Sequence, residues 1–136
     1  MEGRKDKGTL VTNMDAKTLQ NMRKLFKLTA PLLLAIADTN RQQILFDIAE
    51  GGKDGLNVSE LTKKNHLSRP AVSHHLKILK DCSLIATRKQ GTLVYYYLHT
   101  ERDFSPVKRL ISMLEDLIHN IEKSPANATT SKITEK

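Results

Sequence analysis

The most regular pattern of hydrophobic and polar residues lies in the segment 67–80, with the sequence LSRPAVSHHLKILK. At 3.6 residues per turn, Val72, Leu76 and Leu79 fall on one face of a helix. The opposite face is polar and basic and contains Pro70, Ser73, His74 and Lys77. The sequence therefore predicts a helix near 69–80 with one buried face and one face suited to entering a groove of DNA.

Two short helices with a tight turn between them are predicted around this pattern. Ser68 can accept hydrogen bonds from the free amides of the first turn, and Pro70 fits a position that needs no amide donor. Upstream, Asn57 and Glu60 have the spacing of a capping box, which starts a shorter helix. Since only residues 64–68 separate the two, the pattern predicts a helix-turn-helix, whose second helix occupies the major groove.

A β-hairpin is predicted near 84–98. Residues 84–89 and 92–98 have the composition of strands, and the second strand is rich in β-branched and aromatic residues. The turn is expected at Gln90-Gly91, because Gly91 can adopt the positive φ of a short turn. The cations expected at its tip are Arg88 and Lys89. Such a hairpin is expected to act as a wing that lies against DNA phosphates.

Helices are also expected before this winged core. Residues 15–28 carry apolar side chains at helical spacing, and this helix is expected to break near Thr29, before a short helix that Pro31 opens. Asn40 is expected to cap the next helix, 41–50. The expected fold is therefore a winged helix-turn-helix, mainly α with a small β-hairpin wing.

A long apolar stripe follows the wing, on a helix that Ser105 and Pro106 open. The stripe consists of Val107, Leu110, Ile111, Leu114, Leu117, Ile118 and Ile121. The winged core is too small to cover this stripe, so pairing with a second chain is expected to bury it. On the 15–28 helix, the residues expected at the same interface are Leu19, Met22 and Phe26. The alternative is that the stripe packs within its own chain, against 15–28.

The charge of the chain favours a polyanionic partner. The 136 residues carry a formal net charge of +7, and the segment 57–99 holds seven Lys or Arg against two acidic residues. Residues 1–14 are predicted to be a flexible basic arm, with a terminus of no role as the alternative. Residues 124–136 are predicted to be a disordered tail, which leaves 15–123 as one DNA-binding and dimerisation domain.

The compartment is predicted from cysteine content and hydropathy. The single cysteine, Cys82, excludes an intramolecular disulfide and suits a reducing compartment. No apolar run approaches the ~20 residues needed to cross a bilayer, and the first 14 residues lack the apolar stretch of a secretory signal. A cytoplasmic protein with no membrane partner is therefore expected.

Three segments together resemble the winged-helix repressors of the ArsR/SmtB family. They are the run Ala37-Asp38-Thr39-Asn40-Arg41, the segment 68–79 and the strand pair ending in Val94-Tyr95-Tyr96. The resemblance covers roughly residues 31–99 and includes the successive elements in order. It implies binding to double-stranded DNA by a homodimer that is held together through its N- and C-terminal helices.

The predicted DNA contacts divide into two sets. Base-edge contacts are expected from Arg69, Ser73, His74 and Lys77. Phosphate contacts are expected from Arg41, Lys63, Lys64, Ser68, Arg88 and Lys89. For each single charge the alternative is a solvated surface group. His75 lies at the edge of the apolar face and is expected to pack or hydrogen-bond within the protein.

The resemblance also implies a metal sensor, but both known ligand sets are incomplete in this sequence. The soft-metal members carry Cys-x-Cys where this chain has Asn57-Val58-Ser59-Glu60-Leu61, without thiolates. The second family site needs two ligand pairs on the last helix. His119 and Glu122 match one pair, but Pro106 and Lys108 stand at the other. We therefore predict no metal and no cofactor, with a weak site at His119 and Glu122 left open.

Two residues after the recognition helix have more than one interpretation. Cys82 is expected to be a small buried residue rather than a redox switch, because no second thiol is present to resolve it. Ser83 stands where the family often has a glycine, so a left-handed cap there is expected to be strained or built differently.

An enzyme is not expected, because the chain has no phosphate-binding glycine loop or nucleophile and base pattern. The predicted function is a homodimeric repressor that binds an imperfect palindrome, with half-sites ~34 Å apart. Two alternatives remain at this stage: a winged-helix protein-interaction module or anti-repressor, and a nucleoid-type binder of low specificity. The inducing signal or protein partner is not specified by any of these patterns.

Overall fold

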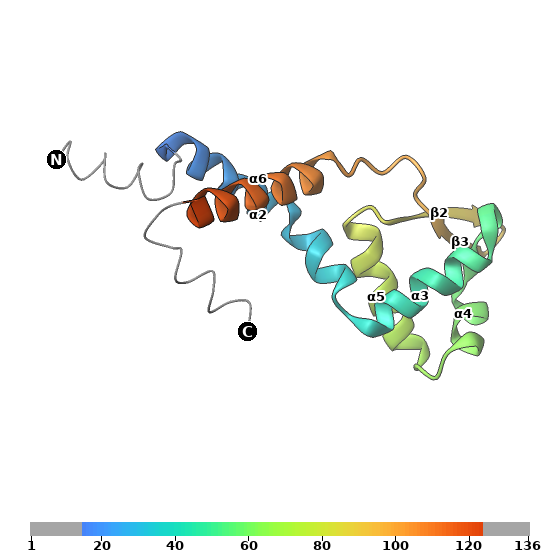
Figure 1. The fold of residues 1–136 in the computed structure, drawn as a ribbon. Coiled ribbons are helices and arrows are strands. Elements are labelled where there is room, and N and C mark those ends of the chain that lie inside the picture. Colours follow the sequence, from blue (N-terminus) through green and yellow to red (C-terminus); the bar gives the residue numbers. More distant parts are fainter. Residues whose placement is uncertain (1–14, 124–136) are drawn as a thin grey trace. The chain divides into compact units, whose positions relative to one another are not determined.

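The computed structural model describes residues 15–123, which form helices α2 to α6 and a small sheet (Figure 1). The elements are α2 (Ala16–Ile36), α3 (Thr39–Glu50), a 3-10 turn (Gly52–Asp54), β1 (Leu56–Asn57), α4 (Val58–Lys64), α5 (Arg69–Asp81), β2 (Ile85–Gln90), β3 (Leu93–Leu98) and α6 (Ser105–Lys123). The predicted arm 1–14 and tail 124–136 lie outside the described residues.

The described residues divide into two compact units. One unit contains residues 30–103, which are the end of α2, helices α3 to α5 and the sheet. The other contains residues 15–29 of α2 together with residues 104–123, which include α6. The fold is mainly helical with a β-hairpin wing, which confirms the predicted fold class.

Helix α2 is continuous through Pro31, so the predicted break near Thr29 was wrong. Proline in a helix interior costs about 3 kcal/mol relative to alanine. Leu32 and Ala35, which follow the proline, are buried. Burying one leucine side chain contributes about 1.5–3 kcal/mol of stability, which offsets much of the cost of the proline. Thr29 is itself buried and donates its hydroxyl to the carbonyl of Leu25 at 2.8 Å, as a residue within a helix does.

Helix α3 begins at Thr39, two residues earlier than predicted, because Asp38 and not Asn40 caps it. The Asp38 carboxylate accepts a hydrogen bond from the backbone N–H of Arg41 at 3.1 Å. This hydrogen bond is the main cause that lowers the pKa of Asp38. Asn40 lies inside the first turn of the helix. Both residues favour N-caps, so the sequence alone did not distinguish them.

The core of the 30–103 unit lies between α3, α4, α5 and the sheet. Its fully buried large side chains are Ile44, Ile48, Leu61, Val72, Leu76, Leu79 and Ile85. The sheet is antiparallel in the order β1-β3-β2, so the hairpin has a third strand that the sequence analysis did not predict. Strand β1 has only two residues, which is too short for a recognisable alternation of apolar and polar positions.

The turn of the hairpin lies one residue later than predicted. Gln90 pairs with Leu93, so Gly91 and Thr92 form the two-residue connection. Gly91 has φ +64°, and a positive φ at the first connecting residue is the pattern of a type II′ turn.

Ser83 holds a left-handed conformation with φ 65°, in the place where a glycine usually ends a helix. Its N–H donates to the carbonyl of Lys80 at 2.9 Å, and the N–H of Leu84 donates to the carbonyl of Leu79 at 3.0 Å. These two bonds make a Schellman motif, which satisfies carbonyls at the end of α5. Among the described non-glycine residues, Ser83 is the only one with a positive φ.

Replacing Ser83 by glycine is expected to stabilise the protein by about 1 kcal/mol, since it removes the cost of a left-handed Cβ. Thermal and urea unfolding would measure the change. Ser83→Ala is the matched control, because it removes the hydroxyl and keeps the Cβ. An equal gain from Ser83→Ala would show that backbone strain is not the cause.

Candidate nucleic-acid interface

The helix-turn-helix is built by local hydrogen bonds of the predicted kind. The Asn57 side chain accepts from the N–H of Glu60 at 2.8 Å, and the Glu60 carboxylate accepts from the N–H of Asn57 at 3.0 Å. This confirms the capping box of α4. Asn65 organises the turn, because its amide donates to the carbonyl of Leu61 and its oxygen accepts from the N–H of Leu67, both at 2.9 Å.

Helix α5, the predicted recognition helix, has the predicted N-cap and the predicted buried face. The Ser68 hydroxyl accepts from the N–H of Ala71 at 3.2 Å, and Pro70 stands in the first turn. Val72, Leu76 and Leu79 are completely buried. This burial directs the opposite face outward, where the exposed residues are Arg69, Pro70, Ser73, His74, Lys77 and Lys80. The predicted base-contacting residues therefore share one exposed face.

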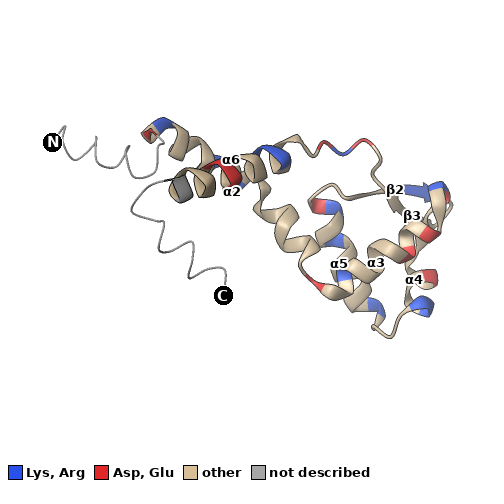
Figure 2. Cartoon of the chain, viewed as in Figure 1, with Lys and Arg blue, Asp and Glu red and all other residues tan. Residues whose placement is uncertain are grey.

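Most of the predicted phosphate-binding cations are exposed, and Figure 2 marks the Lys and Arg positions on α5 and β2. Lys64 pairs with Glu50 at 3.4 Å, and Lys77 pairs with Asp81 at 3.1 Å. Both pairs are open to solvent, and such pairs are worth about 0–1 kcal/mol. They therefore leave Lys64 available to a phosphate and Lys77 available to a base edge.

Arg41 is bound within its own unit rather than exposed as a free cation. Its Nε donates to the carbonyl of Ala35 at 2.8 Å, and one terminal nitrogen donates to the carbonyl of Leu34 at 3.2 Å. The other terminal nitrogen lies 3.1 Å from Nδ1 of His75 on the recognition helix. The sequence suggested phosphate binding for Arg41; in the structure its Nε and both terminal nitrogens have protein partners.

Arg88 is also held by the protein. One of its terminal nitrogens donates to the carbonyl of Asp54 at 3.1 Å and the other to the side chain of Gln90 at 3.3 Å. Its guanidinium carbon lies 5.0 Å from the ring centre of Tyr95, in cation–π range. Lys89, the next residue, is exposed. The two cations of the wing therefore differ, and Lys89 is the one free to meet a phosphate.

A recess of about 260 Å³ lies where the recognition helix meets the wing. Arg69, the first residue of α5, lines it together with Ser59 of α4 and Thr92 of the wing turn. The sequence analysis did not select Ser59 or Thr92. No local pattern distinguishes these hydroxyls, since the fold alone brings them beside Arg69.

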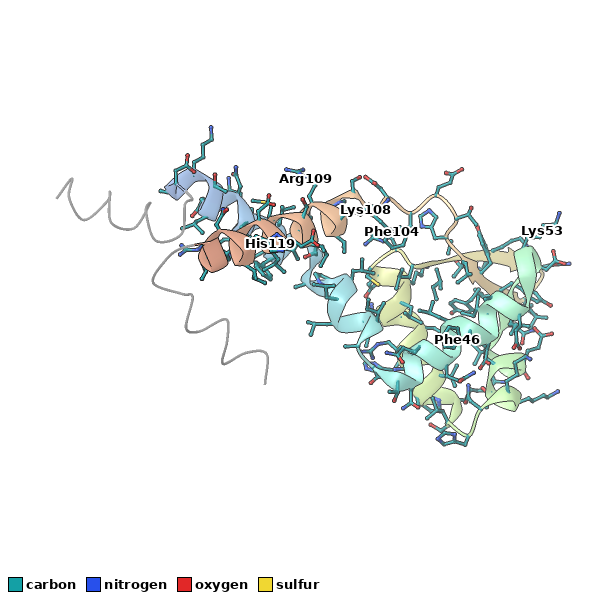
Figure 3. All side chains as sticks on the ribbon, viewed as in Figure 1. Phe46, Lys53, Phe104, Lys108, Arg109 and His119 are labelled. Carbon is teal, nitrogen blue, oxygen red and sulfur yellow. The ribbon has the colours of Figure 1, made fainter. Side chains whose placement is uncertain are left out.

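The residues considered for metal binding or redox control do not form a cluster in the described part of the chain. Among the side chains that the structure describes, no group of three His, Cys, Asp or Glu has a metal-binding arrangement. His119 lies exposed on α6 (Figure 3). The Glu122 side chain lies outside the described part of the structure. Cys82 is buried, as predicted, and its thiol lies 3.4 Å from the carbonyl of Leu79.

The predicted dimer residues lie in the unit formed by α6 and residues 15–29. Leu110 and Met22 are buried there. Phe26, Ile111 and Ile118 remain 43%, 49% and 52% exposed. The half-buried members are Leu19, Val107, Leu114, Leu117 and Ile121. No helix among the described residues combines the length and hydropathy required to cross a bilayer.

A recognition helix with a basic exposed face, supported by a short helix and flanked by a β-hairpin, defines the class of winged helix-turn-helix DNA-binding proteins. The profile described as "Bacterial regulatory protein, arsR family" matches residues 38–87, which run from the start of α3 to β2. The chain belongs to this ArsR family of DNA-binding transcriptional regulators, which is not a family of enzymes.

Known relatives agree with this assignment. The chain is 36% identical over 66 residues to the transcriptional repressor SdpR of Bacillus subtilis, covering 48% of this chain and 70% of SdpR. It is 35% identical over 99 residues to the transcriptional activator HlyU of Vibrio cholerae, covering 73% of this chain and 85% of HlyU. The solved structure of reduced HlyU from Vibrio cholerae aligns with a TM-score of 0.50 and 35% identity, over 72% of this chain and 96% of that chain.

Proposed function

We propose that the protein is a homodimeric transcriptional repressor that binds an imperfect DNA palindrome through α5 and the wing. The observation that supports this most directly is the exposed face of α5, where side chains able to bond to base edges stand opposite a completely buried apolar face. The relative SdpR is named as a repressor and HlyU as an activator. Repression follows where the bound palindrome overlaps the promoter and excludes polymerase.

The dimer is proposed from the apolar surface of α2 and α6. Phe26, Ile111 and Ile118 are each close to half exposed, and a second copy of the same surface would cover them. A two-fold dimer presents two recognition helices, which suits half-sites ~34 Å apart, or ~10 base pairs. Light scattering on the purified chain measures this state directly, and a monomer at the concentrations used for DNA binding would contradict it.

The DNA contacts are proposed to divide by chemistry. Arg69, Ser73, His74 and Lys77 are assigned to base edges. Lys63, Lys64, Ser68 and Lys89 are assigned to phosphates. Ser59 and Thr92 line the same recess as Arg69. Their hydroxyls are proposed as further donors to a DNA phosphate that lies between α5 and the wing.

Selection from a random DNA pool tests the proposal. Repeated selection with the purified protein is expected to enrich a two-fold symmetric sequence, and fluorescence anisotropy should show at least ~10³-fold tighter binding to it than to a scrambled duplex. Binding both duplexes equally and weakly would indicate a nucleoid-type protein. The absence of DNA binding would favour a protein-interaction module, and either result would refute a sequence-specific repressor.

Replacing Lys89 by alanine is expected to weaken binding to the selected and the scrambled duplex alike. Each phosphate contact contributes ~0.9 to the slope of log affinity against log salt concentration, so the slope should fall by about 1. Affinity measured over a salt series tests this. Arg88→Ala is the comparison. Because Arg88 already donates to Asp54 and Gln90, its replacement should change the slope less. An unchanged slope for Lys89→Ala would mean that the wing does not contact a phosphate.

A further inference from the structure

The contact between Arg41 and His75 joins helix α3 to the recognition helix α5. Arg41 lies in the first turn of α3 and donates to the last carbonyls of α2, at Leu34 and Ala35. Gln42 beside it donates to the carbonyl of Ile36 at 2.8 Å. Carbonyls at a helix end have no partner within the helix, so these two side chains complete the end of α2. The remaining terminal nitrogen of Arg41 is directed to His75 of α5.

The chemistry of this contact fixes the protonation of His75. A guanidinium remains charged at all ordinary pH values and can only donate. Nδ1 of His75 lies 3.1 Å from the Arg41 nitrogen, so it must accept, and an accepting Nδ1 belongs to a neutral ring with its proton on Nε2. A protonated ring would place two N–H donors against each other.

The position of His75 gives the contact a consequence for the exposed face of α5. His75 is half-buried and directly follows His74, one of the proposed base-contacting residues. The two rings lie 5.9 Å apart. A shift of the α5 backbone at His75 therefore also shifts Ser73 and His74, its neighbours along the helix, and base contacts depend on where these side chains lie.

We propose that Arg41 is a positioning residue that holds the recognition helix to the end of α2, and that it does so only while His75 is neutral. Acid then releases α5 from this contact and weakens specific DNA binding. The inference rests on the proposed function, because it describes how that function depends on a contact remote from the bases.

The direction of the pH effect follows from the groups around His75. Burial is the largest cause that lowers the pKa of His75, Arg41 and His74 lower it further, and Asp38 raises it. Helix α4 and strand β2 also pack against α5, but within the described residues they add no charged group that shifts this pKa. A depressed histidine pKa stabilises the neutral ring, so the contact is complete above the ordinary value near 6.5 and is lost as the pH falls through the lowered value.

Two variants at position 75 separate the effect of losing the hydrogen-bond acceptor from the effect of protonating the ring. His75→Asn keeps an oxygen at the position of Nδ1, accepts from Arg41 and does not titrate. His75→Leu removes the acceptor and leaves a charged donor unpaired. His119→Gln, an exposed histidine on α6, controls for the general effect of removing one titratable ring.

The experiment measures affinity for the duplex selected by the wild-type protein, from about pH 7.5 to about pH 5. At the upper pH, His75→Asn should bind like wild type and His75→Leu about tenfold more weakly, since hydrogen bonds to charged groups have this size. As the pH falls, the ratio of the wild-type dissociation constant to that of His75→Asn should rise toward tenfold. Protonation of the other histidines acts on both proteins and cancels in this ratio, and His119→Gln should follow wild type.

Arg41→Lys provides the reciprocal variant, because the single nitrogen of a lysine side chain cannot reach the three separate acceptors that the guanidinium contacts. Arg41→Lys should bind the selected duplex about tenfold more weakly than wild type at the upper pH. Its affinity relative to that of His75→Asn should not fall further as the pH is lowered. Melting temperatures of all variants identify any that unfold. A ratio that stays constant over the pH range, or wild-type affinity in folded His75→Leu, would overturn the inference. Failure of the selection itself would instead refute the proposed function.

Discussion

Replacing Ser73 and His74 together by alanine should remove most of the preference for the selected duplex while leaving binding to a scrambled duplex nearly unchanged. Each good base contact contributes ~1–3 kcal/mol, so losing both should reduce discrimination about 100-fold. Both residues are exposed on α5 and lie outside its buried apolar face, so the fold should tolerate their removal. Paired anisotropy titrations on the two duplexes at one salt concentration measure the ratio.

The chain offers a matched control for this double variant. Ser112 and His119 are the same two residue types, both exposed, on α6. Their joint replacement by alanine should leave discrimination at the wild-type level. Retained discrimination in the Ser73 and His74 double variant would remove these residues from base recognition and direct attention to Arg69 and Lys77.

Replacing Gly55 by alanine should produce the largest loss of stability of any substitution considered, at least about 3 kcal/mol. Gly55 has φ 73° and ψ −164°, a region that only glycine occupies readily. A Cβ at this position would lie 2.1 Å from the carbonyl oxygen of Tyr96 and 2.7 Å from its carbonyl carbon. Tyr96 belongs to β3, the central strand, so relieving the clash requires separating β1 from β3.

Gly52 provides the comparison for this prediction. It also has a positive φ, at 64°, but an added Cβ would have no atom within 4 Å. Gly52→Ala should therefore cost only the conformational penalty of about 1 kcal/mol. Urea unfolding followed by far-UV circular dichroism measures both variants. Equal losses for the two would show that the sheet accommodates the extra methyl group by a small local shift.

The recognition helix and its caps were predictable because their signals are local. The apolar spacing of Val72, Leu76 and Leu79 and the caps at Asn57 and Ser68 each span only a few residues of sequence. The structure confirms all of them. In contrast, α2 continues through Pro31 because burial of residues beyond the proline outweighs its local cost, and burial is a property of the folded chain.

The partners of the arginines could not be predicted for the same reason. Arg41 meets His75, and Arg88 meets Asp54, across a sequence separation of 34 residues in each case. From sequence, each was one more cation in a basic chain. The distinction between a cation held by the protein and one free to bind phosphate, as between Arg88 and Lys89, therefore appears only when the fold brings distant residues together.

The aromatic composition of β3 gives the wing its own optical signature. The chain has no tryptophan and three tyrosines, and all three stand in succession in this strand, at Tyr95, Tyr96 and Tyr97. Their ultraviolet absorption and emission therefore come from the hairpin and not from the rest of the molecule. Tyrosine fluorescence of the unlabelled protein thus reports on the wing, while far-UV dichroism reports mainly on the helices, so the two signals can follow separate parts of one chain during DNA titration or unfolding.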